Sequence, residues 1–190
     1  MTPELLGFLE RLYADGRDVD ARRPDRLDRR RNLEPESAAL LRSLVAGANP
    51  ATVLELGTSN GYSTIWLADV VALTTVDNDP RRSADAAENL HAAGVSDRVR
   101  RIVADGAEIL AGSGDGEWEF IFLDAERSLY VDWWTELQRT LAVNGLLVVD
   151  NVLSHADQVA EFRALVDTAE GFRSLVLPVG AGLLVIARQD

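Results

Sequence analysis

Five short apolar runs in this chain each end at an acidic residue or a glycine, and this pattern constrains the fold more than any other feature. The runs are TVLELG (residues 52–57), LTTVD (73–77), RIVAD (101–105), FIFLD (120–124) and LLVVD (146–150). Buried parallel strands have this apolar character, and in open α/β sheets ligands bind just beyond the carboxyl ends of the strands. We therefore expect one crevice that collects the acidic side chains at these strand ends.

Helical segments separate the apolar runs, so the order of elements predicts a Rossmann-like α/β fold. Besides a short helix after the third strand, helices are expected at residues 35–46, 62–71, 80–93, 130–141 and 155–168. Such alternation produces βαβ units with right-handed crossovers, a mostly parallel sheet and helices on both of its faces. Two final runs, 172–177 and 182–187, have no helix between them and should form an antiparallel C-terminal hairpin at one edge of a seven-stranded sheet.

The first 34 residues form an N-terminal helix and an arginine-rich segment in our interpretation, and the main domain occupies residues 35–190. Residues 3–14 carry leucines and aromatics at helical spacing, and a polar stretch follows from Asp15 to Asn32. This stretch contains the arginines Arg22, Arg23, Arg26, Arg29, Arg30 and Arg31. We interpret it as a solvated linker, with a functional lid or a partner surface as the alternative.

Composition narrows the range of partners. A chain of 190 residues, 47% of them hydrophobic, suits one compact domain. Its net charge of −12 disfavours nucleic acid and anionic membranes, which both require a basic surface. Cysteine is absent, so any metal must be bound by oxygen atoms or by the two histidines. The N-terminus does not resemble a signal peptide and no run of ~20 apolar residues occurs, so we expect a cytoplasmic protein with a small-molecule partner.

The loop after the first strand, within VLELGTSNGYS at residues 53–63, makes a tight turn between Gly57 and Gly61. Glycine permits positive φ angles and a close approach of the backbone to a ligand. Dinucleotide sites normally have the spacing G-x-G-x-x-G, whereas this loop is G-x-x-x-G with Glu55 just before it, which disfavours a nucleotide-dependent oxidoreductase. An acid beside the loop suits S-adenosylmethionine, which is cationic and has no phosphate. A plain strand-to-helix turn is the alternative.

Two further strand ends carry acids that suit a nucleoside. Asp77 follows the glycine loop by about 20 residues, the position from which a carboxylate accepts hydrogen bonds from both ribose hydroxyls. Asp79, just before Pro80, is better interpreted as a helix N-cap. Asp105 and Gly106 end the third strand, where they could contact an adenine ring, although Asp105 could equally cap the short helix that follows.

At these motifs the sequence resembles the catechol O-methyltransferase and caffeoyl-CoA O-methyltransferase family of S-adenosylmethionine-dependent, metal-dependent enzymes, including its small bacterial members. The resemblance runs from Asn32 to Arg188 and rests on VLELGTSNGYS, FIFLDAER and GLLVVDNVL, of which the last is the most specific. It implies a class I methyltransferase fold, a homodimer, and methyl transfer to a small catechol-like or phenolic acceptor.

The resemblance also implies roles for individual residues. It places Glu55, Gly57, Ser59 and Ser63 on the methionine part of the cofactor and the Leu33 backbone on its carboxylate end. It places Asp77 on the ribose and Gly106 on the adenine edge, and it counts Asp124 among the cofactor-binding residues. The implied metal ligands are Asp124, Asp150 and Asn151, and together with Arg127 they make up the expected catalytic set.

The ligand chemistry of the last three residues supports a metal independently. Asp124, Asp150 and Asn151 offer hard oxygen donors at adjacent strand ends, the set that Mg²⁺ prefers, and Ca²⁺ or Mn²⁺ would also suit. Without a cation, two such close carboxylates would repel each other and one would tend to protonate. The alternative is that Asp150 and Asn151 only cap the turn after the strand.

Arg127 departs from the family pattern. The family's D-A-D-K is replaced by D-A-E-R at residues 124–127, and arginine cannot readily take the hydroxyl proton that the family's lysine is thought to accept. Metal activation could suffice with Arg127 stabilising the oxyanion, another base such as His155 could serve, or catechol-type activity could be lost. We favour a tolerated substitution, because all 19 basic residues are arginine, and we interpret His155 as part of a helix start.

The remaining alternatives concern aromatic residues and function. Trp133 or Trp134 could line an aromatic acceptor pocket, but their helical spacing favours core packing. The nearest functional alternative is a metal-independent methyltransferase acting on another small molecule. A more distant one is a non-catalytic module that binds S-adenosylmethionine or a nucleoside. Metal dependence and turnover distinguish these possibilities.

Overall fold

The computed structural model describes residues 1–25 and 29–189, and Arg26 of the arginine-rich stretch lies outside them. Seven strands form one sheet in the order β3-β2-β1-β4-β5-β7-β6. The strands are β1 (Val53–Leu56), β2 (Leu73–Asp77), β3 (Val99–Val103), β4 (Trp118–Leu123), β5 (Leu141–Val149), β6 (Phe172–Leu177) and β7 (Leu183–Arg188). The first five are parallel, and β7 lies antiparallel between β5 and β6. The predicted seven-stranded sheet and C-terminal hairpin are confirmed.

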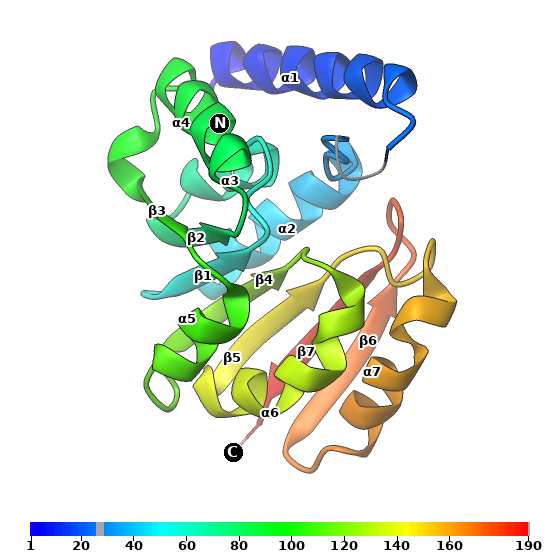
Figure 1. Ribbon diagram of the computed structural model, residues 1–190. Helices are drawn as coiled ribbons and strands as arrows, with labels where there is room; N and C mark the ends of the chain where they lie inside the picture. The colour runs from blue at the N-terminus through cyan, green and yellow to red at the C-terminus, as the bar shows by residue number, and fades with distance from the viewer. Residues whose placement is uncertain (26–28, 190) are drawn as a thin grey trace.

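Helices cover both faces of this sheet (Figure 1). They are α1 (Pro3–Arg22), α2 (Pro35–Ala48), α3 (Tyr62–Ala68), α4 (Pro80–Ala92), α5 (Gly106–Gly112), α6 (Tyr130–Thr140) and α7 (Ala156–Thr168). Three-residue 3₁₀ turns, η2 (Ser96–Arg98) and η3 (Arg127–Leu129), precede β3 and α6. Within the described residues, no helix is long and apolar enough to cross a membrane.

The alternation of side chains along the strands divides the core into two layers. On β4, Phe120 and Phe122 pack with α1 to α4, whereas Ile121 and Leu123 pack with α5 to α7. All four are fully buried, as expected for a central parallel strand covered on both faces. Leu9 of α1 is also fully buried in the first layer, so the N-terminal helix shares its core with the sheet.

Local sequence explains where several helices begin. Thr2 and Asp79 each accept a hydrogen bond from a backbone N–H in the first turn of α1 and α4, and a proline follows both caps. Asp105 caps α5 by accepting from the N–H of Ala107 at 2.8 Å. The predicted N-cap role of Asp79 and the capping alternative for Asp105 are both confirmed.

Two predicted boundaries differ from the structure by five residues or more. The first helix ends at Arg22, eight residues beyond the predicted end at Ala14, because buried Gly16 and half-buried Val19 continue its packed face. The fifth strand begins at Leu141, five residues before the predicted start. Its early part pairs with Trp118 across a register shift. The polar residue Asn144, whose φ is +64°, interrupts the apolar pattern there.

Candidate active site

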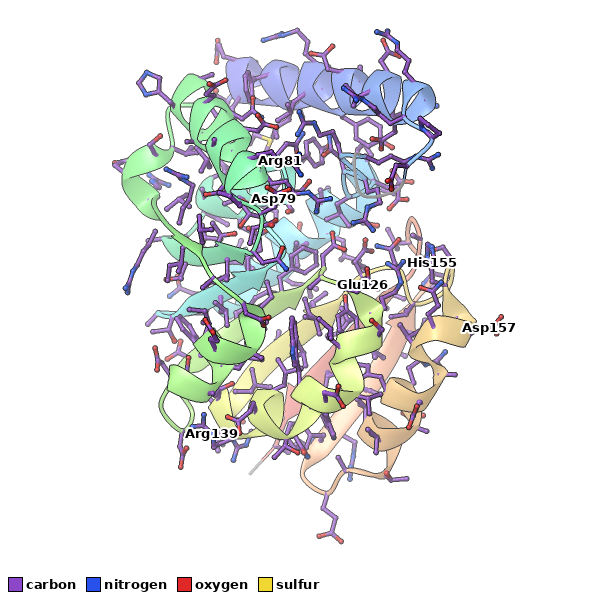
Figure 2. All side chains as sticks on the ribbon, in the orientation of Figure 1. Asp79, Arg81, Glu126, Arg139, His155 and Asp157 are labelled. Atoms are coloured by element: carbon purple, nitrogen blue, oxygen red, sulfur yellow. The ribbon has the colours of Figure 1, made fainter. Side chains whose placement is uncertain are left out.

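The site lies where the chain order of the strands reverses, at the carboxyl ends of β1 and β4. Two cavities, of about 440 and 290 Å³, adjoin there and are called the larger and the smaller cavity. The residues that line both are Arg31, Gly57, Asp77, Arg82 and Asp124. Figure 2 shows Glu126 and His155 on the loops that follow β4 and β5, and Arg139 toward the opposite end of the sheet.

Gly57 allows the ends of β1 and β4 to approach each other. Its φ is +110°, and a Cβ at this position would lie 2.0 Å from the carbonyl oxygen of Asp124. No other residue type fits this approach without moving the backbone. Beyond it, the N–H of Ser59 donates to Asp77 at 2.8 Å, and the Ser59 hydroxyl donates to the carbonyl of Arg30 at 2.9 Å. The glycine loop is thus joined to β2 and to the arginine-rich segment.

Glu55 lies beneath this loop with no exposed surface. Its oxygens accept hydrogen bonds from the hydroxyls of Ser63 at 2.6 Å, Thr64 at 2.5 Å and Thr75 at 2.7 Å. Burial raises the pKa of Glu55 to about 7, despite the three hydroxyl donors. Neither Glu55 nor Ser63 is among the described residues that line the two cavities. The structure therefore places both residues behind the crevice, where they hold the first turn of α3 against β1 and β2.

The larger cavity has apolar walls and a charged rim that carries both acids and arginines. The walls are Leu56, Val76, Ala104, Leu129 and Trp133. Trp133 is 7% exposed, so it packs in the core as expected and also presents an edge to the cavity. A Cβ on Gly106 would come within 2.7 Å of this ring, which leaves room for glycine alone. On the rim, Asp77 is buried and accepts the backbone N–H groups of Ser59 and Asp79.

The smaller cavity holds the acidic cluster predicted at the ends of β4 and β5. The amide nitrogen of Asn151 lies 2.5 Å from Asp150 Oδ2 and 3.5 Å from Asp124 Oδ1, so the three side chains meet. Burial, followed for Asp150 by the charge of Asp124, raises the pKa of both carboxyl groups. Among the described residues, Asp150 Oδ1 is buried without a hydrogen-bond partner. Burial therefore disfavours the ionised form of both carboxyl groups, and the charge of Asp124 adds to this effect at Asp150.

These residues fit a divalent cation in chemistry. The described residues contain no group of three or more His, Cys, Asp or Glu side chains suited to a metal ion, so the set is two carboxylates and one amide. Asn151 now turns its NH₂ toward the carboxylates, and a half-turn about its last bond would present the amide oxygen instead. The unsatisfied Asp150 Oδ1 and the mutual repulsion are features that a bound cation would relieve.

Arg127 is buried at the edge of the same cavity, with 4% of its surface exposed. Its Nε donates to Gln158 Oε1 of α7 at 2.8 Å. Its Nη2 is buried and has no hydrogen-bond partner within residues 1–25 and 29–189. Sequence reasoning missed Gln158, since a glutamine on a helix after a strand gives no signal of a role at a site.

The arginine-rich segment also reaches the site, which corrects its interpretation as a solvated linker. The carboxylate of Asp20 accepts the N–H groups of Arg30 at 2.6 Å and Arg31 at 3.0 Å. The Arg30 side chain pairs with Asp85 of α4. Residues 29–32 and Glu34 line the smaller cavity, and Leu33 between them is buried. The segment therefore covers the end of the crevice that contains the acidic cluster, which is nearer to the alternative interpretation of a lid than to a solvated linker.

His155 lies just before α7 and lines the smaller cavity. Its Nδ1 is 2.9 Å from the hydroxyl of Ser154. The helix α7 begins at Ala156, directly after His155, so the predicted helix start at this position is confirmed. His155 makes no side-chain cap for the helix.

The fold and the site define a class, the Rossmann-like methyltransferases. The O-methyltransferase TomG of Streptomyces achromogenes, solved in complex with S-adenosylmethionine, matches with a TM-score of 0.80 at 22% identity, over 96% of this chain and 90% of that one. An O-methyltransferase of Bacillus cereus, solved in complex with S-adenosylhomocysteine, has a TM-score of 0.79 at 20% identity, over 96% and 91% of the two chains.

The chain belongs to the O-methyltransferase family, whose family model matches residues 16–187. It is 37% identical over 126 residues to a catechol O-methyltransferase of Mycobacterium tuberculosis, covering 62% of this chain and 56% of that enzyme. It is 29% identical over 163 residues to a catechol O-methyltransferase of Niastella koreensis, covering 82% and 73%. The chain thus spans between about half and three quarters of these relatives. The family and the fold predicted from the sequence are confirmed.

Proposed function

We propose that this protein transfers the methyl group of S-adenosylmethionine to a hydroxyl oxygen of a small catechol-like or phenolic acceptor, assisted by a divalent metal, most simply Mg²⁺. The observation that carries the proposal is the junction of the two cavities. A larger cavity with apolar walls and the rim acid Asp77 opens, past Gly57 and Asp124, into a smaller one that contains Asp150 and Asn151. A nucleoside suits the first cavity and a polar, oxygen-bearing acceptor suits the second.

In this account the adenosyl part occupies the larger cavity. The adenine ring packs against the Trp133 edge beside Gly106, and Asp77 accepts the ribose hydroxyls, which requires it to share its oxygens with two backbone donors. The methionine part extends past Gly57 and Ser59 toward the backbone near Leu33. Glu55 and Ser63 support this loop from behind rather than contacting the cofactor.

Asp124, Asp150 and Asn151 would hold the cation, which when bound lowers the pKa of a coordinated phenolic hydroxyl. The chain's own residues supply position. Gly57 and Asp124 fix the junction at which the sulfonium methyl meets the acceptor oxygen, and the covering segment at residues 29–32 excludes water. Transfer is an in-line displacement, so its rate depends chiefly on this alignment.

A metal-independent methyltransferase is the second candidate, and one observation favours it. Burial raises the pKa of Asp124, and the charges of Arg31 and Arg127 oppose this rise. The acidic cluster thus already has cationic neighbours. Metal dependence separates the two candidates. A cytoplasmic location, a homodimeric assembly and the absence of nucleic-acid or membrane partners stay proposals, supported by the net charge of −12 and the small-molecule cavities.

The proposal is tested with methyl-labelled S-adenosylmethionine and a panel of catechols and simple phenols, in Mg²⁺ and in EDTA, by counting label in the organic extract. We expect transfer selective for catechols and abolished by EDTA. Asp150→Asn should reduce transfer by on the order of 100-fold, because it replaces a charged metal ligand with a neutral one and so weakens cation binding.

Asp157→Asn is the matched control, since this exposed acid at the start of α7 points away from the crevice (Figure 2). It should leave transfer unchanged. Transfer that survives EDTA supports the metal-independent candidate. Cofactor binding without transfer to any acceptor of the panel contradicts the proposal.

A further inference from the structure

We infer that Arg127 binds the acceptor oxygen as an anion, with Gln158 as its positioning residue, and that the protein therefore takes its phenolic acceptors in their ionised form. This inference rests on the proposed function and names the acceptor species. It assigns Arg127 the role of an anion-binding catalytic residue, and it excludes Arg127 as the group that removes the hydroxyl proton.

The first support is the unsatisfied donor. Arg127 is 4% exposed, lines the smaller cavity, and keeps Nη2 without a hydrogen-bond partner among the described residues. A buried donor left unpaired costs about 1–3 kcal/mol, and more on a charged group, so such groups in folded proteins usually have a ligand or water as partner. An oxygen anion is the ligand that a guanidinium N–H prefers.

The second support is the way the guanidinium is held. Gln158 Oε1 accepts from Nε at 2.8 Å, and this neutral partner fixes the plane of the group without neutralising its charge. The other charged or titratable residues that line this cavity are Arg29, Arg30, Arg31, Glu34, Asp77, Arg82, Asp124, Asp150 and His155. Arg127 acts on Asp124 and Asp150 through its charge, but no ion pair joins it to a carboxylate among the residues the structure describes. A charged, oriented N–H is thus available to a ligand.

The third support is chemical. Arginine does not give up its proton in the accessible pH range, so Arg127 can donate hydrogen bonds but cannot act as a base. When the acceptor is a phenolate, an oxygen electron pair forms the new O–C bond while the C–S bond breaks and its electron pair stays on sulfur. The sulfonium becomes a neutral thioether and the phenolate becomes a neutral ether, so no proton has to be removed during the step.

Arg127 then contributes by raising the ionised fraction of the bound acceptor and by aiming its oxygen. The stabilised anion is a weaker nucleophile, so the benefit is greatest for acceptors that are largely un-ionised in solution at the working pH.

The test uses 4-nitrocatechol, whose ionised form has its own visible absorption band, bound to the complex of the full chain with S-adenosylhomocysteine. Its ionisation is titrated spectrophotometrically for wild type, Arg127→Met, Arg127→Lys and Gln158→Ala, once with Mg²⁺ and once with EDTA. Variants are compared within each condition, so any effect of the metal cancels. Binding of S-adenosylhomocysteine, measured by calorimetry, verifies that each variant is folded.

In wild type we expect the bound probe to ionise at a lower pH than the free probe, with the anion bound about tenfold more tightly than in Arg127→Met. Arg127→Lys should keep this preference because it keeps the charge. Gln158→Ala, a change at an exposed helix position, should retain part of it. A lysine can also accept a proton, so Arg127→Lys should alter the pH dependence of kcat, whereas Gln158→Ala should leave its shape unchanged.

An unchanged ionisation of the bound probe in wild type, or a preference for the anion that survives Arg127→Met, overturns the inference. If the wild type nevertheless methylates the probe, the proposed function stands without it. If the probe neither binds nor is methylated in any condition, and other phenols also fail as acceptors, the proposed function and the inference fall together.

Discussion

Glu55 illustrates what single residues contribute beneath the site. Its carboxyl group is fully buried and is held by three hydroxyls, so the glycine loop depends on a group that does not face the cavities. The resemblance placed Glu55 and Ser63 at the methionine part of the cofactor, and in the structure neither residue lines the two cavities. Their spacing in the sequence could not reveal this, because the partner Thr75 lies on the next strand.

The raised pKa of Glu55 predicts a pH-dependent stability. The group titrates at about 7 in the folded protein against an ordinary value of 4.5, so between these pH values the folded state binds more protons than the unfolded state. Wild-type stability should therefore fall as the pH rises from about 4.5 to 7, by on the order of 3 kcal/mol at 1.36 kcal/mol per pKa unit. Glu55→Gln removes this contribution to the pH dependence of stability, because glutamine does not ionise.

Chemical denaturation at pH 5 and pH 8 checks this prediction. Wild type should lose stability between pH 5 and pH 8, whereas Glu55→Gln should not lose it in this way. The free energy of unfolding of Glu55→Gln minus that of wild type should therefore be larger at pH 8 than at pH 5. The control Glu161→Gln removes an exposed carboxyl group from α7 and should follow wild type. Parallel pH profiles for wild type and Glu55→Gln would contradict the account.

At the scale of elements, the arginine-rich segment is held over the crevice by a few polar contacts. Asp20, near the end of α1, accepts the N–H groups of Arg30 and Arg31, and Ser59 donates to the Arg30 carbonyl. These contacts join the N-terminal helix to the glycine loop through one short segment. The conformation of this segment therefore depends on the last turns of α1, which extend beyond the apolar residues of that helix.

We expect Asp20→Ala to loosen this segment and weaken cofactor binding by about tenfold, since two charge-assisted hydrogen bonds are lost. Calorimetric titration with S-adenosylhomocysteine measures the effect. Asp18→Ala serves as the control, because Asp18 is 74% exposed and, among the described residues, pairs only with Arg22 one turn away in α1. Equal affinities for Asp20→Ala and wild type would mean that the segment does not order the cofactor site.

Elements with strong local signals could be predicted, and those set by distant contacts could not. The strand ends at Asp77 and Asp124 follow from apolar runs, and the start of α4 follows from Asp79 and Pro80. The full length of α1 and the early start of β5 depend on packing and on a register shift, which leave no periodic pattern.

At the scale of the whole molecule, topology brings the site together. The order β3-β2-β1-β4-β5-β7-β6 places β1 and β4 next to each other at the centre (Figure 1). Asp77 at the end of β2 and Asp124 after β4, which are far apart in the sequence, therefore lie at the same end of the sheet. Parallel strands made the clustering of Asp124, Asp150 and Asn151 predictable. Gln158 was not predictable as a site residue, and residues 29–31 were considered only through the lid alternative, because long-range docking brings both to the site.

We propose that one crevice holds a nucleoside at Asp77, and that Asp124, Asp150 and Asn151 hold a divalent cation beside the acceptor oxygen. A crystal structure with S-adenosylhomocysteine, catechol and Mn²⁺, whose anomalous signal locates the metal, tests it most directly. We predict the ribose at Asp77, an anomalous peak within coordination distance of the three side-chain oxygens, and a catechol oxygen between this peak and the cofactor sulfur. A bound cofactor with no metal at the acidic cluster, or a catechol outside the smaller cavity, would contradict the account.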